Sequence, residues 1–575
     1  MRRGLIAALA LACVAVVTVL APAPAHAATV PDPLADGPHR VARADYSLGD
    51  TAYSIPNFPG PSELTGDVFY PTDFRGMPYP IVMLLHGRHE TCMTKKEPLA
   101  DWPCPKGSTP IPSYRGYDYL ARSLATHGCV VISISANGIN AADATVTDSG
   151  MNARGELILK HLDLWSQWRK DPAAAPIPPQ YLSEFDFTRI GLMGHSRGGE
   201  GIVAALEINR LRKNPYAIRA VLPLAPTDFD RRIPTGIPVG VMLGTCDGDV
   251  SDMEGIHYFD DGRYRTASDP AIRNVITIEG ANHNYFNTAW SPSSGYPGAA
   301  DDWSYAGGPK TSPCSPTRPT RLTEKQQRTA ASAYIGSFFR YYLGGESAFA
   351  GLWNGSAPEP PGVAPATVKV SYLPAADARR DISRFDYETM DQNDLGGKLT
   401  MTGLRQVNVC GGVGIDLAVS CLSRADVSPE REPERGWYFA GLTAQPLEWT
   451  KPGAALTEGI PAKYGDVRSF GAVQFRAAVD FTFAPNGASQ DLRVVLTDTA
   501  GHRASATVSH YSNGLRREQG NPSGADVVPH LLYNQVRVPL SAFAGVDRAH
   551  IAKVALVMDQ KPQGRIIVSD LGFDA

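Results

Sequence analysis

The sequence reads IGLMGHSRGGEGIVAAL from Ile190 to Leu206, and this stretch decides the fold. Its first four residues are apolar or glycine and predict a buried strand, whereas its last eight are mostly small or apolar and predict a helix packed close to a sheet. Between them, Gly194, Ser196 and Gly198 form the pattern G-x-S-x-G. Because the glycines remove side chains that would clash in a sharp turn, we expect a strand, a strained turn that exposes the serine hydroxyl, and a helix.

Two further apolar runs follow, and each leads into a residue that an activated serine requires. A serine hydroxyl is a weak nucleophile at neutral pH, so it needs a base within hydrogen-bond reach and an acid that orients the base. Residues 239–244 predict a strand that runs into Asp247, and residues 275–278 predict one followed by His283. The chain order serine, aspartate, histidine therefore predicts a catalytic triad, in which Asp249 remains the alternative acid.

Stabilisation of a developing oxyanion requires two backbone N–H donors near the serine. Arg197 directly follows the serine and is the expected first donor. The apolar run 81–85 predicts another strand, and it continues into the sequence HGRH from His86 to His89. Arg88 in this loop is the expected second donor.

These motifs resemble the α/β-hydrolases over about residues 40–345. The HGR loop is similar to the His-Gly-x loop of esterases and polyester hydrolases, and Gly244–Val250 resembles the acid loop of the superfamily. The segment from Ala220 to Val239 is too short to hold a large helical cap. An open cleft without such a cap resembles secreted polyester hydrolases, chlorophyllase-like enzymes and platelet-activating-factor acetylhydrolases. The resemblance implies an α/β fold with a doubly wound, mostly parallel sheet, followed by an all-β sandwich.

The predicted reaction is hydrolysis of a carboxylic ester, either a small molecule or a polymer, without a cofactor. A peptidase or an acyltransferase using the same three residues is an alternative enzyme. A catalytically silent carbohydrate-binding or adhesion protein is an alternative of a different class. We expect no metal site, because His86, His89 and His127 lack a second pair of ligands at suitable spacing, and residues 247–252 lack the spacing of a calcium loop.

The N-terminus predicts export from the cell. Arg2 and Arg3 precede an apolar run, and Ala27 ends an A-x-A site, so residues 1–27 are a predicted signal peptide and the mature protein is expected to be secreted. The twin arginine leaves a folded-export route open. No later apolar run is long enough to predict a membrane span. The formal charge of −4 becomes −6 once Arg2 and Arg3 are removed, which argues against a nucleic-acid partner.

The cysteines are consistent with an oxidising compartment, where disulfides persist. Cys13 lies in the predicted signal peptide, which leaves seven of the eight cysteines in the mature chain. We expect bridges between Cys92 and Cys104 and between Cys410 and Cys421, with Cys246 and Cys314 as a further candidate pair and Cys129 as a buried free thiol.

A chain of 575 residues is too long for one ordinary domain. Helical patterns at 117–126, 153–168 and 324–342 belong to the first domain, and short alternating strands follow a proline-rich stretch. The expected division is a signal peptide at 1–27, a catalytic domain at 28–350, an extended proline-rich linker at 351–366 and a jelly-roll-like β-sandwich at 367–575.

The last strands resemble those of jelly-roll carbohydrate-binding modules, which implies attachment to a polysaccharide or polymer surface. A stabilising appendage is the alternative role for this part of the chain. If the boundary is right, a chain that ends near Gly355 should keep its own core and hydrolyse soluble esters.

Overall fold

The computed structural model describes ten segments of the chain. They are residues 30–73, 78–250, 253–264, 269–298, 313–385, 391–405, 444–480, 483–487, 489–516 and 532–575. The predicted signal peptide with Cys13, and the predicted pair Cys410 and Cys421, lie outside the described residues. Within the described segments, no helix is both long and apolar enough to cross a membrane.

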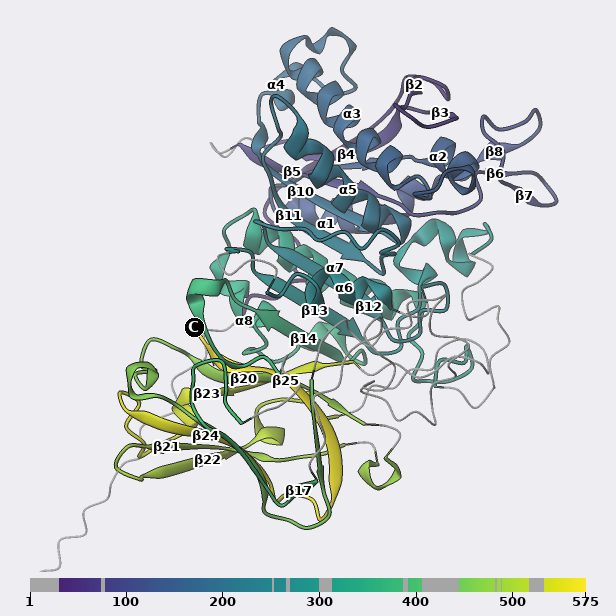
Figure 1. The fold of residues 1–575 in the computed structure, drawn as a ribbon. Helices are drawn as coiled ribbons and strands as arrows, with labels where there is room; N and C mark the ends of the chain where they lie inside the picture. Colours follow the sequence, from purple (N-terminus) through teal and green to yellow (C-terminus); the bar gives the residue numbers. More distant parts are fainter. Residues whose placement is uncertain are drawn as a thin grey trace, which may run out of the picture.

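A nine-stranded mixed sheet organises the N-terminal part of the described chain (Figure 1). Neighbouring strands from β9 to β13 run parallel, whereas β1, β4 and β14 pair antiparallel. The parallel strands are covered on both faces, which explains their nearly continuous apolar sequences. In sheet order the strands are β1 (Val41–Ser47), β4 (Thr65–Pro71), β9 (Val130–Ile134), β5 (Tyr79–Leu85), β10 (Phe185–His195), β11 (Ile218–Leu224), β12 (Val239–Gly244), β13 (Arg273–Ile278) and β14 (Val368–Leu373).

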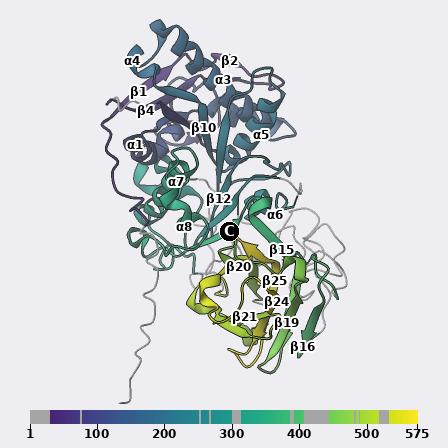
Figure 2. The same ribbon diagram turned by 90° about the vertical axis from the view of Figure 1, so that its left-hand side faces the viewer.

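Helices cover both faces of this sheet, as Figure 2 shows with α1 and α7 on one side and α3 and α5 on the other. One core includes Trp165 of α3 and Val203 of α5, and the other includes Leu124 of α1 and Phe338 of α7. The helices are α1 (Asp118–Thr126), α2 (Asn137–Ala142), α3 (Met151–Lys170), α4 (Pro179–Leu182), α5 (Arg197–Leu211), α6 (His257–Asp260), α7 (Glu324–Tyr342) and α8 (Ala350–Trp353). An α/β arrangement is therefore present.

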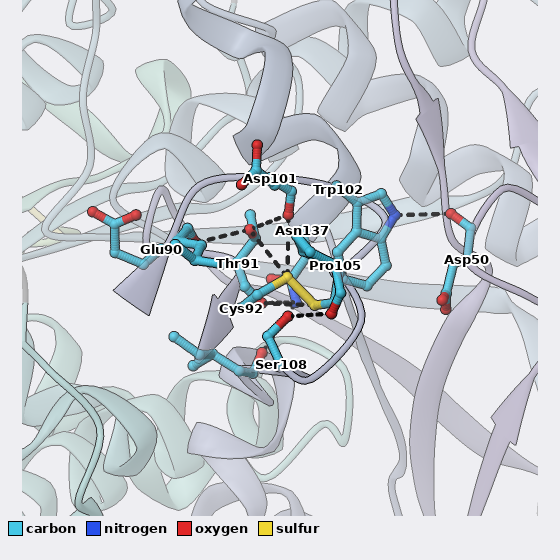
Figure 3. The surroundings of a disulfide bond; sticks show 12 residues. Asp50, Glu90, Thr91, Cys92, Asp101, Trp102, Pro105, Ser108 and Asn137 are labelled. Carbon is cyan, nitrogen blue, oxygen red and sulfur yellow. Dashed lines mark hydrogen bonds between the residues drawn. A yellow bond between two sulfur atoms is a disulfide. The ribbon is translucent and has the colours of Figure 1, made fainter. Parts of the chain in front are cut away.

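A small irregular region beside the main sheet contains the first disulfide. Cys92 and Cys104 are joined as predicted. Trp102 beside the bridge donates its indole N–H to the carbonyl of Asp50 at 2.8 Å (Figure 3). The short strands here are β2 (Tyr53–Ser54), β3 (Pro61–Ser62), β6 (Cys92–Met93), β7 (Pro98–Leu99) and β8 (Thr109–Pro110).

The other predicted cysteine states are also observed. Cys246 and Cys314 form a second disulfide, so the candidate pair is confirmed. Cys129, directly before β9, is a buried free thiol. Burial raises the pKa of its thiol to about 12, so it stays protonated and unreactive at neutral pH.

Two antiparallel sheets form the C-terminal part (Figure 1). They share one apolar core. Phe475 and Ile566 enter this core from one sheet, and Val494 and Leu556 enter it from the other. The first sheet contains β15 (Arg379–Ser383), β17 (Leu404–Arg405), β18 (Gln445–Trp449), β20 (Ala472–Val479), β23 (Asn534–Pro539) and β25 (Gly564–Asp574), and the second contains β16 (Leu399–Thr402), β19 (Ala454–Gly459), β21 (Arg493–Asp498), β22 (Arg503–Thr507) and β24 (Ile551–Met558).

The segment predicted as an extended linker is instead packed against the first part. Trp353 and Val363 are buried in the core that contains α7, because apolar side chains stand before and between the prolines. Directly afterwards, β14 pairs antiparallel with β13, so the main sheet takes a strand from beyond residue 366. The linker prediction is therefore wrong, and a chain ending near Gly355 lacks a strand of the main sheet.

Buried ion pairs connect the two parts of the protein. Arg476 of β20 contacts Asp260 of α6, and Arg263 contacts both Asp260 and Asp570. The four side chains are almost fully buried. Removing one partner from such a network leaves an uncompensated charge away from water, so these contacts hold the two parts in one arrangement.

We predict that Arg476→Met lowers the free energy of unfolding by about 3 kcal/mol, because the Asp260 carboxylate loses one of its two guanidinium partners. Arg468→Met is the matched control, since Arg468 pairs with Asp466 in an exposed site and should leave the free energy of unfolding nearly unchanged. Urea denaturation followed by fluorescence measures both. Equal effects of the two substitutions would contradict the assigned role of the buried network.

Candidate active site

Ser196 occupies the turn between β10 and α5 in a backbone conformation that amino acids with a side chain rarely adopt. Its φ is 59° and its ψ is −130°. The two flanking glycines are required by close contacts, because a Cβ on Gly194 would lie 2.0 Å from the carbonyl oxygen of Gly198, and one on Gly198 would lie 2.6 Å from that of Leu85. The sequence thus folds into the strand, sharp turn and helix that its glycine pattern predicts.

Asp247 and His283 are brought together from the loops after β12 and β13. The Oδ2 atom of Asp247 lies 2.8 Å from Nδ1 of His283, and both residues are buried. The other carboxylate oxygen accepts the backbone N–H groups of Asp249 and Val250 at 3.0 and 2.8 Å. The carboxylate is therefore fixed by the backbone and places the proton of the imidazole on Nδ1, which leaves Nε2 as the basic nitrogen.

Asp249, the alternative acid, lies at the opposite ring nitrogen. Its Oδ2 atom is 3.5 Å from Nε2 of His283, and its side chain is 22% exposed. A carboxylate in this position does not orient Nδ1. Asp247 is therefore the carboxylate placed to hold the His283 ring.

Several contacts hold the histidine loop beside the acid loop. The side chain of Gln327 on α7 accepts from the backbone N–H of Asn282 at 2.9 Å and donates to the carbonyl of the same residue at 2.6 Å. The N–H of Cys246 donates to the carbonyl of Ala281 at 2.8 Å, and the disulfide from Cys246 to Cys314 attaches a further segment here. The spacing between acid and histidine is thus set by backbone contacts on both sides.

Aromatic rings surround the buried histidines. The ring of His195 lies 4.7 Å from that of His283 and 4.9 Å from that of Trp290, measured between centroids. Phe286 and Trp290 are almost fully buried, so these two rings are part of the core and do not form an open cleft wall. Burial lowers the pKa of His195 well below its usual value, which keeps this neighbour of the serine uncharged.

The loop after β5 lies directly against the serine. A Cβ on Gly87 would lie 2.4 Å from the Cβ of Ser196, so only glycine fits. The carbonyl of Gly87 is 2.8 Å from Nδ1 of His86 and accepts from the side chain of Asn140 at 3.1 Å. Nε2 of His86 accepts the N–H of Ala136 at 2.9 Å, so Nδ1 carries the hydrogen and donates. Two donors therefore fix the peptide plane that ends in the N–H of Arg88.

Burial lowers the pKa of His86 to about 3, so its imidazole stays neutral and keeps this tautomer over the physiological pH range. His89 lies on the far side of the loop, where its Nε2 is 2.8 Å from the carbonyl oxygen of Pro297. The histidines of this loop therefore have separate hydrogen-bond partners. Among the residues that the structure describes, no group of three side chains is suited to hold a metal ion.

One buried carboxylate that the sequence did not suggest joins both expected oxyanion residues. Asp143, which begins the short turn η2 (Asp143–Thr145), is fully buried. Its Oδ1 lies 3.3 Å from Nε of Arg88, and its Oδ2 lies 2.8 Å from Nη1 of Arg197 and 2.9 Å from Nη2 of Arg154. No local motif marks Asp143, because the contacts come from three elements far apart in the sequence.

Comparison with models of known protein families gives no match, and comparison with curated proteins gives none either. A function for this chain is therefore argued from the chemistry of the site.

We predict that Gly87→Ala destabilises the protein by about 1–3 kcal/mol, because its Cβ would overlap that of Ser196 and force the loop or the turn to move. Gly336→Ala is the matched control: it lies inside α7 with open space at the Cβ position, and alanine there should raise stability by up to about 1 kcal/mol. Thermal unfolding monitored by circular dichroism compares them. An unchanged melting temperature for Gly87→Ala would refute the close approach of the loop to the serine.

Proposed function

We propose that this protein is a serine hydrolase that cleaves carboxylic esters. The observation that carries the proposal is the strained turn at Ser196 together with the 2.8 Å contact between Asp247 and His283. The three residues follow β10, β12 and β13, which are parallel strands of one sheet, so they lie along the same edge. This order and placement are typical of α/β-hydrolases, the fold class that we propose for the first part.

In the proposed reaction, Oγ of Ser196 attacks the ester carbonyl carbon while Nε2 of His283 takes the hydroxyl proton. The tetrahedral intermediate carries its negative charge on the former carbonyl oxygen, which accepts hydrogen bonds from the backbone N–H groups of Arg88 and Arg197. Collapse breaks the bond to the alcohol oxygen, and His283 returns the proton to it. Water then attacks the acyl-serine by the same route and releases the carboxylic acid. Asp247 stabilises the imidazolium throughout.

The two disulfides and the predicted signal peptide support placing this hydrolase outside the cell. For the C-terminal part, the two antiparallel sheets around one core support a jelly-roll-like sandwich. Its proposed role is to support the catalytic part.

The test that separates an enzyme from a silent binding protein is reaction with a fluorophosphonate probe. We predict stoichiometric labelling of the purified protein at Ser196, found by peptide mass spectrometry, and no labelling of Ser196→Ala. The variant should fold normally because it loses only a hydroxyl. Labelling at another serine would refute the assignment of Ser196. No labelling in a correctly folded protein would refute the hydrolase and favour the carbohydrate-binding alternative.

Comparing the rates of hydrolysis of 4-nitrophenyl esters and of peptides distinguishes the ester hydrolase from a peptidase. Product analysis with added alcohol distinguishes hydrolysis from acyl transfer. The proposal requires that released acid is the main product from esters and that peptides are poor substrates.

We predict that Asp247→Asn lowers kcat for a 4-nitrophenyl ester by about 10⁴-fold, because the amide holds the imidazole in the wrong tautomer. Asp249→Asn should lower it by less than about tenfold, since this carboxylate faces Nε2 and does not orient the ring. Steady-state kinetics at neutral pH gives both values. The reverse order of effects would make Asp249 the catalytic acid.

A further inference from the structure

Two arginine side chains beside the serine retain hydrogen-bond donors that no described residue of the protein uses. The side chain of Arg88 is 50% exposed and that of Arg197 is 21% exposed, and the polar contacts described for each are with Asp143. Arg88 uses its Nε and Arg197 uses its Nη1. Among the described contacts, the two Nη groups of Arg88 and the Nη2 group of Arg197 remain available to a ligand. A guanidinium with free donors is suited to bind a carboxylate.

The charge of this cluster is not balanced. Asp143 supplies one negative charge to Arg88, Arg154 and Arg197, so the formal charge of the four groups is +2. Arg154 is fully buried and also donates to the carbonyl of Ser149 and the side chain of Asn140. The excess positive charge therefore resides on the two arginines that reach solvent.

Neighbouring acids offset only part of this charge, because Glu200 lies near Arg154 and adds at most one negative charge. Glu200 is buried, and its oxygens accept from the hydroxyl of Thr227 and the N–H groups of Phe229 and Asp230. Burial raises the pKa of Glu200, and burial together with the nearby Glu200 raises the pKa of Asp228 to about 9, so Asp228 is mostly protonated at neutral pH.

An exposed aromatic ring completes the surface. Phe229 is 48% exposed, and the guanidinium carbon of Arg197 lies 5.6 Å from the centre of its ring. This cation–π contact holds the arginine on the ring face. The result is an apolar surface next to two cations, which suits a ligand with an apolar body and an anionic end.

The side of the serine that faces the leaving alcohol has the opposite charge. His283 must return a proton to the alcohol oxygen through Nε2, so the alcohol lies near this nitrogen. The carboxylate of Asp249 is 3.5 Å from the same nitrogen and would repel an anionic alcohol. The proposed oxyanion donors are the backbone N–H groups of Arg88 and Arg197. The side chains of the same two residues are therefore available to the acyl part of a substrate.

We infer that the enzyme is selective for esters whose acyl part ends in a negatively charged group such as a carboxylate, bound by Arg88 and Arg197. This inference rests on the proposed ester hydrolysis and adds the substrate class. The bond chemistry is unchanged: the same serine attacks the same ester carbonyl, and the distant carboxylate takes no part in bond making.

The test compares three 4-nitrophenyl esters of similar length that differ in the charge at the far end of the acyl chain. They are mono(4-nitrophenyl) adipate, its neutral methyl ester, and the cationic 4-nitrophenyl 6-(trimethylammonio)hexanoate. We predict that kcat/KM falls in that order, with roughly 10- to 100-fold between the anion and the neutral ester, as expected for hydrogen bonds to a charged group. High salt should reduce the ratio between the anion and the neutral ester because exposed charges are screened.

A second pair of probes places the charge on the alcohol. The anion 4-acetoxybenzoate should be hydrolysed no faster than its neutral methyl ester, because Asp249 stands on the alcohol side. A preference for the anion in this pair as well would show general attraction of anions and would overturn the assignment to the acyl part.

Variants test the two arginines directly, with the anion-to-neutral ratio of kcat/KM as the readout. Arg88→Gln and Arg197→Gln should each lower this ratio about tenfold. Arg88→Lys keeps the positive charge, so most of the anion-to-neutral ratio should remain. Arg212→Gln is the matched control: it removes an arginine paired with Asp163 at the other end of α5, about 22 Å away by helix geometry, and should leave the ratio unchanged.

The outcomes separate this inference from the proposed function. The inference would be overturned if the neutral ester is hydrolysed rapidly and the kcat/KM values of the three 4-nitrophenyl esters lie within about threefold of one another. That result would leave the hydrolase assignment intact. Failure to hydrolyse any probe, in a protein that also fails to react with the fluorophosphonate, would refute both. If a glutamine variant does not fold, the salt dependence of the unaltered protein still decides the question, because selectivity unaffected by salt contradicts binding by exposed arginines.

Discussion

The unfavourable backbone conformation of Ser196 is the constraint on which the rest of the site depends. A non-glycine residue at φ 59° and ψ −130° costs roughly 1–3 kcal/mol and persists only where its surroundings fix it. Here the N–H of Ser196 donates to the carbonyl of Leu224 at 2.9 Å, and its own carbonyl accepts from Gly199 at 2.7 Å. Neighbouring strand and helix thus hold the turn from both ends, and the glycines at 87, 194 and 198 provide the space.

Buried acceptors hold the other loops at this edge of the sheet in the same manner. Glu63 binds the N–H groups of Asn137 and Gly138 after β9, Glu200 binds those of the loop after β11, and Asp247 binds those of its own loop after β12. Backbone N–H groups that would otherwise be buried without partners are satisfied by carboxylates. These loops are thereby kept in one geometry, as the proposed nucleophile and base would require.

How far the sequence predicts this protein depends on how local each signal is. Strand β12 has the predicted bounds because buried parallel strands are uninterrupted apolar runs, and α7 has its predicted bounds because Thr323 and Gln326 form a capping box at its start. Asp143 was missed because its partners are 11 to 55 residues away. The linker was wrongly predicted because proline content indicates local stiffness. It does not show which apolar side chains pack into a core formed by residues elsewhere in the chain.

The position of β14 determines how the C-terminal part relates to the site. β14 pairs with β13, the strand that leads into His283, and the N–H of Glu279 donates to the carbonyl of Thr367 at 2.9 Å. Arg516 of the C-terminal part binds the Glu279 side chain at 2.6 Å. A module that only attaches an enzyme to a polymer gains by effective concentration and needs no fixed contact with the catalytic part. Contacts next to the histidine loop, with the buried pair of Arg476 and Asp260, therefore favour the stabilising role over the attachment role.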